Sequence, residues 1–183
     1  MNRRHFVRSG LVLLGIARLG DALAVTPECA DEPTLSQTAG PFYTAGSPQR
    51  VSLMEPDLVG DRLLLSGRVL DRDCRPLGGA LLDFWQADAE GVYDNRGYRL
   101  RGHQYSDERG EYRLETLVPG LYPGRTRHIH VVVAVTGQRP LITQLYFPDE
   151  PQNRRDWLYR PELLVTLKAG NDPLRAGFDF VLR

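Results

Sequence analysis

The sequence has little of what several common classes of protein need. Its 183 residues include two cysteines and four histidines, so a metal site made mainly of imidazole would need nearly every histidine in the chain. No stretch reaches about 20 consecutive apolar residues, the length that a membrane-spanning helix needs. Basic and acidic residues balance at 23 each, which gives no support to nucleic-acid binding. These absences favour a small organic partner.

The first 24 residues resemble an export signal rather than part of a folded domain. Arg3 and Arg4 precede an apolar run, Leu11–Ala17, and the triplet Ala22–Ala24 fits a signal-peptide cleavage site. The paired arginines indicate a twin-arginine signal. An uncleaved membrane anchor is the alternative, but Arg18 interrupts the apolar run too early for it. We therefore predict cleavage, a periplasmic or secreted location, and no membrane association afterwards.

The rest of the chain, residues 25–183, is predicted to form one domain. It holds 19 basic and 22 acidic side chains, a formal charge of −3, and its length suits an ordinary core. Cys29 and Cys74 are its only cysteines, and an even number in an exported protein favours a disulfide between them. Two unrelated buried thiols are the alternative.

From Arg62 onward, short runs with a period of two residues are separated by Gly, Pro, Asp and Asn. This pattern is typical of an all-β sandwich or barrel. In the first run, Leu63, Leu65 and Val69 alternate with other positions, so the strand can bury one face. About seven strands are expected, a number that suits a two-sheet β-sandwich. The later runs lie at Leu81–Trp85, Glu111–Leu117, Arg127–Val135, Leu141–Phe147, Leu163–Leu167 and Phe178–Leu182.

Two long stretches, Thr34–Met54 and Ala87–Ser106, are too irregular for a ladder of strands. The second is rich in Gly, Asp, Arg and Tyr. Long loops on a rigid sandwich commonly carry function. We therefore expect the functional site to lie where these loops meet the sheets.

Two histidines stand two residues apart, at His128 and His130, in a run of strongly β-forming residues. On a strand, both imidazoles face the same way. Ile129, Val131 and Val133 would then form the opposite, core-packed face. The pair can supply two ligands to one metal ion, although such a pair alone also fits a merely polar strand face.

Further ligands of such a site should be oxygen donors, because histidine is so scarce. Tyr93 and Tyr122 lie in turn-rich segments and are candidates. A ligating phenol must lose its proton, and a strongly Lewis-acidic cation such as iron(III) is needed to lower its pKa from about 10. Mixed phenolate and imidazole ligation would thus indicate ferric iron. Each tyrosine taken alone fits a loop aromatic that caps the sandwich equally well.

Several segments together resemble a known family, the intradiol ring-cleavage dioxygenases, which include protocatechuate 3,4-dioxygenase and catechol 1,2-dioxygenase. The similarity spans most of residues 25–183 and keeps the order of the segments along the chain. The segments are Thr38–Tyr43, Ala80–Asp94, Leu100–Gly102, Ser106–Tyr112, Pro119–Tyr122, Gly124–Arg125, His128–His130 and Thr143–Phe147.

The resemblance implies a mononuclear, non-haem iron(III) centre held by two tyrosines, two histidines and a solvent hydroxide. The matching ligands are Tyr93, Tyr122, His128 and His130. It also implies that Tyr122 leaves the metal when substrate binds. The substrates would be a small aromatic diol, protocatechuate-like or catechol itself, and O2, and the product a cis,cis-muconate-type diacid. A homo-oligomer is left open.

The same resemblance gives two further residues a catalytic role. Arg125 would lie beside the bound catecholate, where a fixed positive charge can stabilise developing negative charge. Gln144 would line the same pocket.

Two other classes of function remain as alternatives. One is a non-catalytic β-sandwich binding module of the transthyretin-like sort, which keeps the fold without the metal. The other is a zinc or copper site that uses His103 together with His128 and His130. Intact tyrosine and histidine positions favour the iron enzyme over both.

Overall fold

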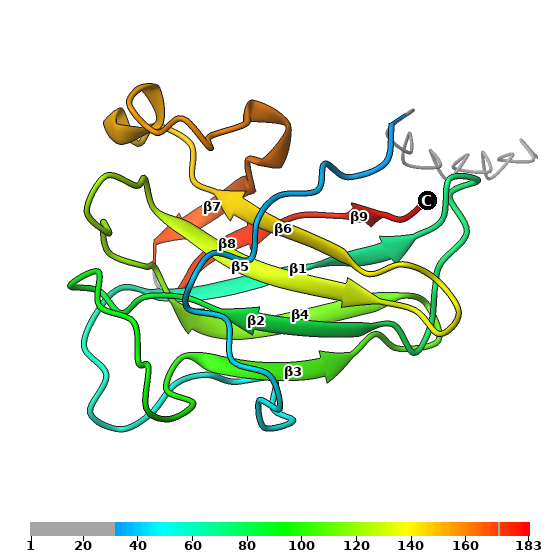
Figure 1. Ribbon diagram of the computed structural model, residues 1–183, viewed down its shortest axis with the longest axis horizontal. Coiled ribbons are helices and arrows are strands. Elements are labelled where there is room, and N and C mark those ends of the chain that lie inside the picture. The colour runs from blue at the N-terminus through cyan, green and yellow to red at the C-terminus, as the bar shows by residue number, and fades with distance from the viewer. Residues whose placement is uncertain (1–31, 172) are drawn as a thin grey trace, which may run out of the picture.

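Two β-sheets pack face to face in the computed structural model, which describes residues 32–171 and 173–183 (Figure 1). One sheet has the order β4-β1-β8-β7, with β9 beside β1, and the other has the order β3-β2-β5-β6. The predicted two-sheet β-sandwich is therefore confirmed. The strands are β1 (Arg62–Leu70), β2 (Leu81–Trp85), β3 (Arg101–Tyr105), β4 (Glu111–Leu117), β5 (His128–Ala134), β6 (Leu141–Tyr146), β7 (Thr166–Asn171), β8 (Leu174–Gly177) and β9 (Phe180–Val181).

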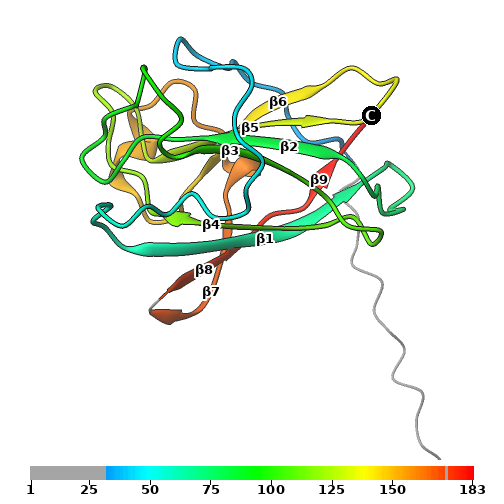
Figure 2. The ribbon, with the colours of Figure 1, turned by 90° about the horizontal axis from the view of Figure 1, so that it is seen from below.

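The core lies between the two sheets, which Figure 2 shows as two layers. Leu63 and Leu65 of β1 face Ile129, Val131 and Val133 of β5, and all five side chains are fully buried. Burial of each such side chain contributes about 1.5–3 kcal/mol. The alternation in the sequence thus correctly assigns the inward face of both strands, and it leaves the other face of β5 for the histidines.

Strand β3 lies inside the stretch Ala87–Ser106 that the sequence predicts to be irregular. That expectation was wrong for Arg101–Tyr105, because this strand buries polar groups in place of an apolar stripe. Arg101 is 1% exposed and Gln104 is 4% exposed. The guanidinium of Arg101 is hydrogen-bonded to carbonyls, and Oε1 of Gln104 accepts the amide of Arg113, so this strand lacks the usual apolar signal.

The C-terminal part also differs from the sequence-based expectation. The strand predicted at Leu163–Leu167 begins only at Thr166, because Pro161 opens a short 3-10 helix, η2 (Pro161–Leu163). A similar helix, η1, spans Pro151–Arg154. Strand β8 was not expected, since its four residues are too few to show a period.

The N-terminal stretch Thr34–Met54 is irregular, as predicted, and runs over the outer face of the β3-β2-β5-β6 sheet (Figure 1). The amide of Gln37 donates to the carbonyl of Ile142 on β6 at 2.7 Å. Further along, the amide of Arg50 donates to the carbonyl of His103 on β3 at 2.8 Å. This stretch therefore covers the sheet that carries both histidines of β5.

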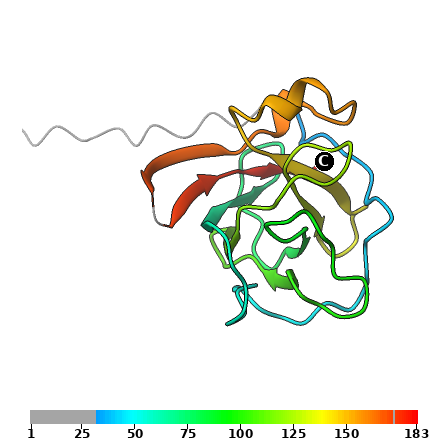
Figure 3. The ribbon, with the colours of Figure 1, turned by 90° about the vertical axis from the view of Figure 1, so that its left-hand side faces the viewer.

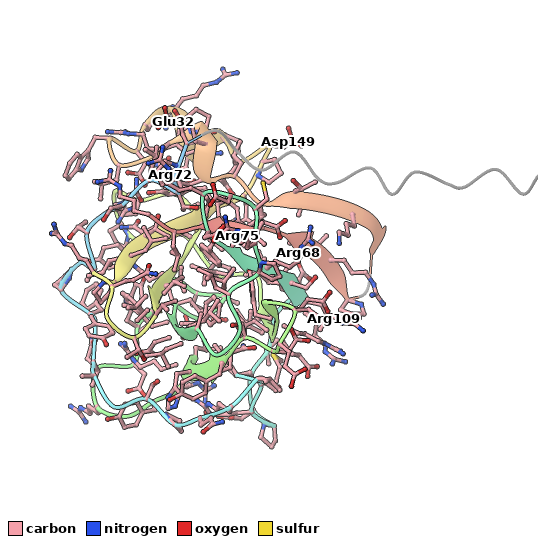
Figure 4. The ribbon with its side chains drawn as sticks, turned by 90° about the vertical axis from the view of Figure 1, so that its right-hand side faces the viewer. Glu32, Arg68, Arg72, Arg75, Arg109 and Asp149 are labelled. Atoms are coloured by element: carbon pink, nitrogen blue, oxygen red, sulfur yellow. The ribbon has the colours of Figure 1, made fainter. Side chains whose placement is uncertain are left out.

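The two ends of the sandwich differ in what they carry. Figure 3 faces the end where the long loops after β2 and β4 gather. Figure 4 faces the opposite end, where Arg68, Arg72, Arg75 and Arg109 lie around the β1–β2 and β3–β4 turns. Within the described residues, no helix is long and apolar enough to cross a membrane.

Cys74 lies in the β1–β2 turn, in a left-handed backbone conformation with φ of 61°. Cys29 and the predicted signal peptide, residues 1–24, lie outside the described residues. The disulfide and the export signal therefore stay predictions.

Candidate metal centre

His128 and His130 project from the outer face of β5, as the strand pattern predicts. The two residues are 4% and 3% exposed. In the sheet register, Trp85 of β2 and Gln144 of β6 are the direct neighbours of His130 on either side. Directly paired residues share one face of a sheet, so this row of side chains forms the floor of the site.

Three of the predicted ligand atoms meet above this floor. The phenol oxygen of Tyr93 lies 3.1 Å from Nε2 of His128, which in turn lies 3.1 Å from Nε2 of His130. The Nδ1 of His128 lies 2.6 Å from the carbonyl oxygen of Thr126 and therefore carries the proton that it donates there. Nε2 of His128 is then unprotonated, and its lone pair points into the cluster.

The protonation states of these groups suit a metal ligand set. Burial, with help from the charge of Arg125, lowers the pKa of His128 to about 4. Burial also lowers the pKa of His130, and the neighbouring His128 lowers it further. Both imidazoles are therefore neutral near pH 7, which is the form that binds a metal.

The phenol of Tyr93 needs a cation in order to ionise. Burial raises its pKa above the ordinary value, and Arg125 and Arg101 only partly oppose this effect. Nε2 of His130 faces His128, whereas Nδ1, on the other side of the ring, is buried without a hydrogen-bond partner among the described residues. Two neutral imidazoles and a phenol that ionises only next to strong positive charge fit the ligand shell of a ferric ion.

Tyr122, the fourth predicted ligand, comes from the loop after β4. Its ring lies edge-on to that of Tyr93, with 5.9 Å between the ring centroids, and the residue is only half-buried. The structure thus brings all four predicted ligands to one place. Tyr122 is the most exposed of the four, at the rim of the cluster.

Two glycines let the loops that carry the tyrosines approach each other. A Cβ atom on Gly91 would lie 2.0 Å from the carbonyl oxygen of Leu121. A Cβ atom on Gly120 would lie 2.3 Å from the carbonyl oxygen of Ala89. Only glycine fits at either position. The two loops therefore pack backbone against backbone, which brings Tyr93 and Tyr122 together although they are far apart in the sequence.

Aromatic rings enclose the cluster. Phe42, from the N-terminal stretch, stacks on Tyr93 with 4.6 Å between centroids and meets Tyr122 edge-on at 5.4 Å. Trp85 stacks on His130 at 4.7 Å with an interplanar angle of 7°. Neither Phe42 nor Trp85 was predicted to have a role of its own, although both lie in the segments that carry the family resemblance.

Arg125 and Gln144, the predicted catalytic residues, bond to each other beside the histidines. Nη2 of Arg125 donates to Oε1 of Gln144 at 2.5 Å, and Nε2 of Gln144 donates to the carbonyl of Thr38 at 2.9 Å. On its other side, Nε of Arg125 donates to Oδ2 of Asp156 at 2.8 Å. Asp156 is fully buried at its carboxylate, and it fixes the direction of the guanidinium.

Sequence reasoning missed Asp156, because a single acidic residue in an irregular segment carries no local signal. Its carboxylate also accepts the backbone amides of Thr126 and Leu158, each at 2.9 Å. It therefore ties the segment before β5 to the segment after η1.

His103 does not join the other two histidines. His103 lies on β3, and its Nδ1 lies 2.7 Å from the carbonyl oxygen of Ser47. Among residues 32–171 and 173–183, no group of three or more His, Cys, Asp or Glu side chains is placed to hold a metal ion. The alternative zinc or copper site built on His103, His128 and His130 was therefore wrong.

Comparison with known proteins shows which family the chain belongs to. The chain matches the protein family described as Dioxygenase over residues 38–183. It is 49% identical to the dioxygenase domain of a dioxygenase and carbohydrate-binding protein fusion from the bacterium Streptomyces sp. SirexAA-E. That structure superposes with a TM-score of 0.80, and the match covers 82% of this chain and 98% of that one.

Among curated relatives, a hydroxyquinol 1,2-dioxygenase from Rhizobium sp. is 31% identical over 90% of this chain and 64% of its own length. A catechol 1,2-dioxygenase from Acinetobacter baylyi is 29% identical over 73% of this chain and 53% of its own length. The chain thus spans between about half and two thirds of these relatives. The family match covers well over half of the chain, which therefore belongs to the dioxygenase family whose named members are intradiol ring-cleavage enzymes.

Proposed function

We propose that this protein is an iron(III)-dependent intradiol dioxygenase that cleaves a catechol-type ring between its two hydroxyl-bearing carbons. Both atoms of O2 would enter the product, a cis,cis-muconate-type diacid. The named relatives act on hydroxyquinol, catechol and protocatechuate. These three compounds share two hydroxyl groups on adjacent ring carbons, and this is the substrate class that the proposal carries over to this chain.

One observation carries the proposal: Tyr93, His128 and His130 converge on a common point, with contacts of 3.1 Å. With Tyr122 beside them, they offer two phenols and two neutral imidazoles. When bound there, iron(III) would bind the ionised diol and accept electron density from it, which would make the ring reactive toward O2. No carboxylate belongs to the proposed ligand set, in contrast to the two-histidine, one-carboxylate sites typical of ferrous oxygenases.

Arg125 supplies a fixed positive charge to the pocket. Its guanidinium is held on one side by the buried carboxylate of Asp156 and on the other by Gln144. A cation held in this way costs no rearrangement when negative charge develops on the substrate. We assign to Arg125 the stabilisation of the anionic substrate and of the charge that develops during ring opening.

The protons of the diol also need acceptors. Tyr122 lies at the rim and is only half-buried, so its side chain can leave the cluster without opening the core. Its phenolate oxygen would accept one proton from the incoming diol, and a solvent hydroxide would accept the other. Phe42 stacks on Tyr93 and Trp85 stacks on His130, so these two rings shield the remaining ligands from water.

The test is product analysis after incubation of the iron-loaded protein with catechol, protocatechuate and hydroxyquinol under isotopically labelled O2. We expect a muconate-type diacid that carries two labelled oxygen atoms from at least one of the three. A yellow semialdehyde, which would mean cleavage outside the diol, contradicts the proposal. Binding of all three without turnover would favour the non-catalytic binding module instead.

We further propose that the protein acts outside the cytoplasm, on the basis of the twin-arginine pattern at Arg3 and Arg4. Fractionation of cells that express the chain with its natural N-terminus tests this. We expect the mature protein in the periplasm or medium, and its N-terminus at Val25. Replacement of both arginines by lysine should keep the protein in the cytoplasm, and continued export of that variant would argue against the assignment.

A further inference from the structure

Arg101 is a buried cation beside the proposed ligand Tyr93, and the sequence left its role open. The residue is 1% exposed. Its guanidinium donates to backbone carbonyls: twice to that of Asp94, at 3.0 and 2.7 Å, and once to that of Phe42, at 2.5 Å. Within the described parts of the chain, no carboxylate forms an ion pair with it.

The position of Arg101 in the sheet places it in line with the site. Arg101 on β3 pairs with Trp85 on β2, which pairs with His130 on β5, which pairs with Gln144 on β6. Directly paired residues share a face. One row across all four strands therefore carries Arg101 at one end and the pocket residue Gln144 at the other.

The two carbonyls that Arg101 binds flank Tyr93 on both sides. Asp94 follows Tyr93 in the chain, and Phe42 stacks on the ring of Tyr93 at 4.6 Å. The rigid fork of the guanidinium thus ties together the backbone that carries the phenol and the segment that packs against it. An arginine can span both contacts at once, whereas the single ammonium of a lysine can hold only one of them firmly.

A buried charge without a counter-ion is costly. The carboxylates of Asp94 and Asp83 act on Arg101 through space without an ion pair, and the phenol of Tyr93 adds a negative charge beside it when it ionises, because an iron-bound tyrosine is a phenolate. The charge of Arg101 is therefore better compensated when the metal site is filled.

We propose that Arg101 is a positioning residue for Tyr93: its guanidinium clamps the chain on both sides of the phenol and serves as the counter-charge of the phenolate. The inference rests on the proposed function, since it needs Tyr93 as an iron ligand. Arg101 touches neither substrate nor metal in this account and acts through Tyr93.

The experiment compares Arg101→Lys and Arg101→Met with Arg50→Lys in the iron-loaded protein. Arg50 is the matched control, because it also donates to carbonyls of the same loop, those of Tyr98 and Arg101, but pairs its charge with Glu55 at 3.4 Å. The readouts are the position of the visible absorption band and the rate at which a chelator removes iron. Neither depends on turnover.

We expect the Met variant to lose iron roughly 10- to 100-fold faster than the parent, the scale seen when a group that supports a metal ligand is removed. Its band should move to longer wavelength, because loss of the positive charge raises the energy of the phenolate electrons. The Lys variant keeps the charge but not the fork, so its band should stay near that of the parent while iron loss is still accelerated. Arg50→Lys should change neither readout.

Each outcome decides the matter. If both Arg101 variants match Arg50→Lys in band and iron loss, the inference is overturned while the proposed function stands. If the Met variant does not fold, the Lys variant alone decides by the same comparison of iron loss. A parent protein that binds iron without a visible phenolate band would overturn the proposed function, and the inference with it.

Discussion

The two ends of the sandwich satisfy their polar groups in different ways. At the end that Figure 4 faces, Asp107 accepts the amides of Arg109 and Glu111, two and four residues further along the chain. Arg75, with 71% of its side chain exposed, pairs with Asp73 only two residues away. These polar groups find their partners within a few residues, although Arg68 at the same end pairs with Asp179, which lies between β8 and β9.

At the end that Figure 3 faces, the partners come from distant parts of the chain. Arg125 and Asp156 are 31 residues apart, and Arg101 reaches the carbonyl of Phe42 across 59 residues. His130 keeps a buried nitrogen without a partner among the described residues. The short-range contacts of the turn end thus stabilise turns, whereas the long-range contacts of the loop end hold together the residues of the proposed metal site.

The largest effect should follow from removal of a metal ligand at the loop end. We expect His130→Ala to weaken iron binding by at least roughly 100-fold, above the range seen for groups that merely support a ligand. His103→Ala is the matched control, because His103 bonds Ser47 away from the cluster. Iron content after gel filtration measures both. Equal loss of iron in the two variants would contradict the assignment of His130 as an iron ligand.

Removal of the fixed charge should cost turnover without loss of the metal. For Arg125→Ala we expect kcat/KM to fall by about 2 to 4 kcal/mol of transition-state stabilisation, or roughly 30- to 1,000-fold. Steady-state kinetics on the best substrate provides the measurement, and the visible band should survive. Arg75→Ala, at the turn end, should leave the rate unchanged. A loss of less than about threefold for Arg125→Ala would remove this residue from the mechanism.

The metal-free protein should lose stability in mild acid through His128. Because burial lowers the folded-state pKa from 6.5 to about 4, the unfolded chain binds more protons between these values, and stability falls as pH drops through this window. The loss is complete near pH 4 and amounts to roughly 3 kcal/mol. Urea unfolding of the parent protein and of His128→Gln, each at pH 7 and pH 4, isolates the contribution of His128 to this loss. An identical acid loss in the variant would contradict the assignment.

Substitution of one aspartate at each end compares directly how much the two ends contribute to the free energy of unfolding. Asp156→Asn should lower the free energy of unfolding by roughly 2–3 kcal/mol, because it breaks a buried pair with Arg125. Asp107→Asn keeps an oxygen that can accept the two amides of an exposed turn, so we expect a loss below about 0.5 kcal/mol. Urea unfolding at pH 7 compares them. Similar losses would show that the two ends do not differ in the way described.

The same contrast explains how far the sequence could predict the structure. Leu63 and Leu65 of β1, the core face of β5 and the turns at Asp107 follow from periods and turn residues that operate over a few positions. The outward direction of His128 and His130 follows from the same rule. These features could be predicted because the information that specifies them is local.

What could not be predicted is long-range or polar. Strand β3 has no apolar period, because two of its buried residues, Arg101 and Gln104, are polar and form hydrogen bonds in the interior. Asp156 acquires its role only when the segment after η1 folds back onto Arg125. The joint placement of Tyr93 and Tyr122 came from resemblance to a family, because no spacing rule brings together two loops that meet through Gly91 and Gly120.

The most direct measurement of the central claim is the visible spectrum of the iron-loaded protein and of its Tyr93→Phe and Tyr122→Phe variants. The account predicts a red to purple protein, because charge transfer from phenolate to iron(III) absorbs visible light. Each single substitution should shift or bleach the band. A colourless iron-loaded protein, or two variants that both keep the parent spectrum, would contradict the assignment of these tyrosines as ligands.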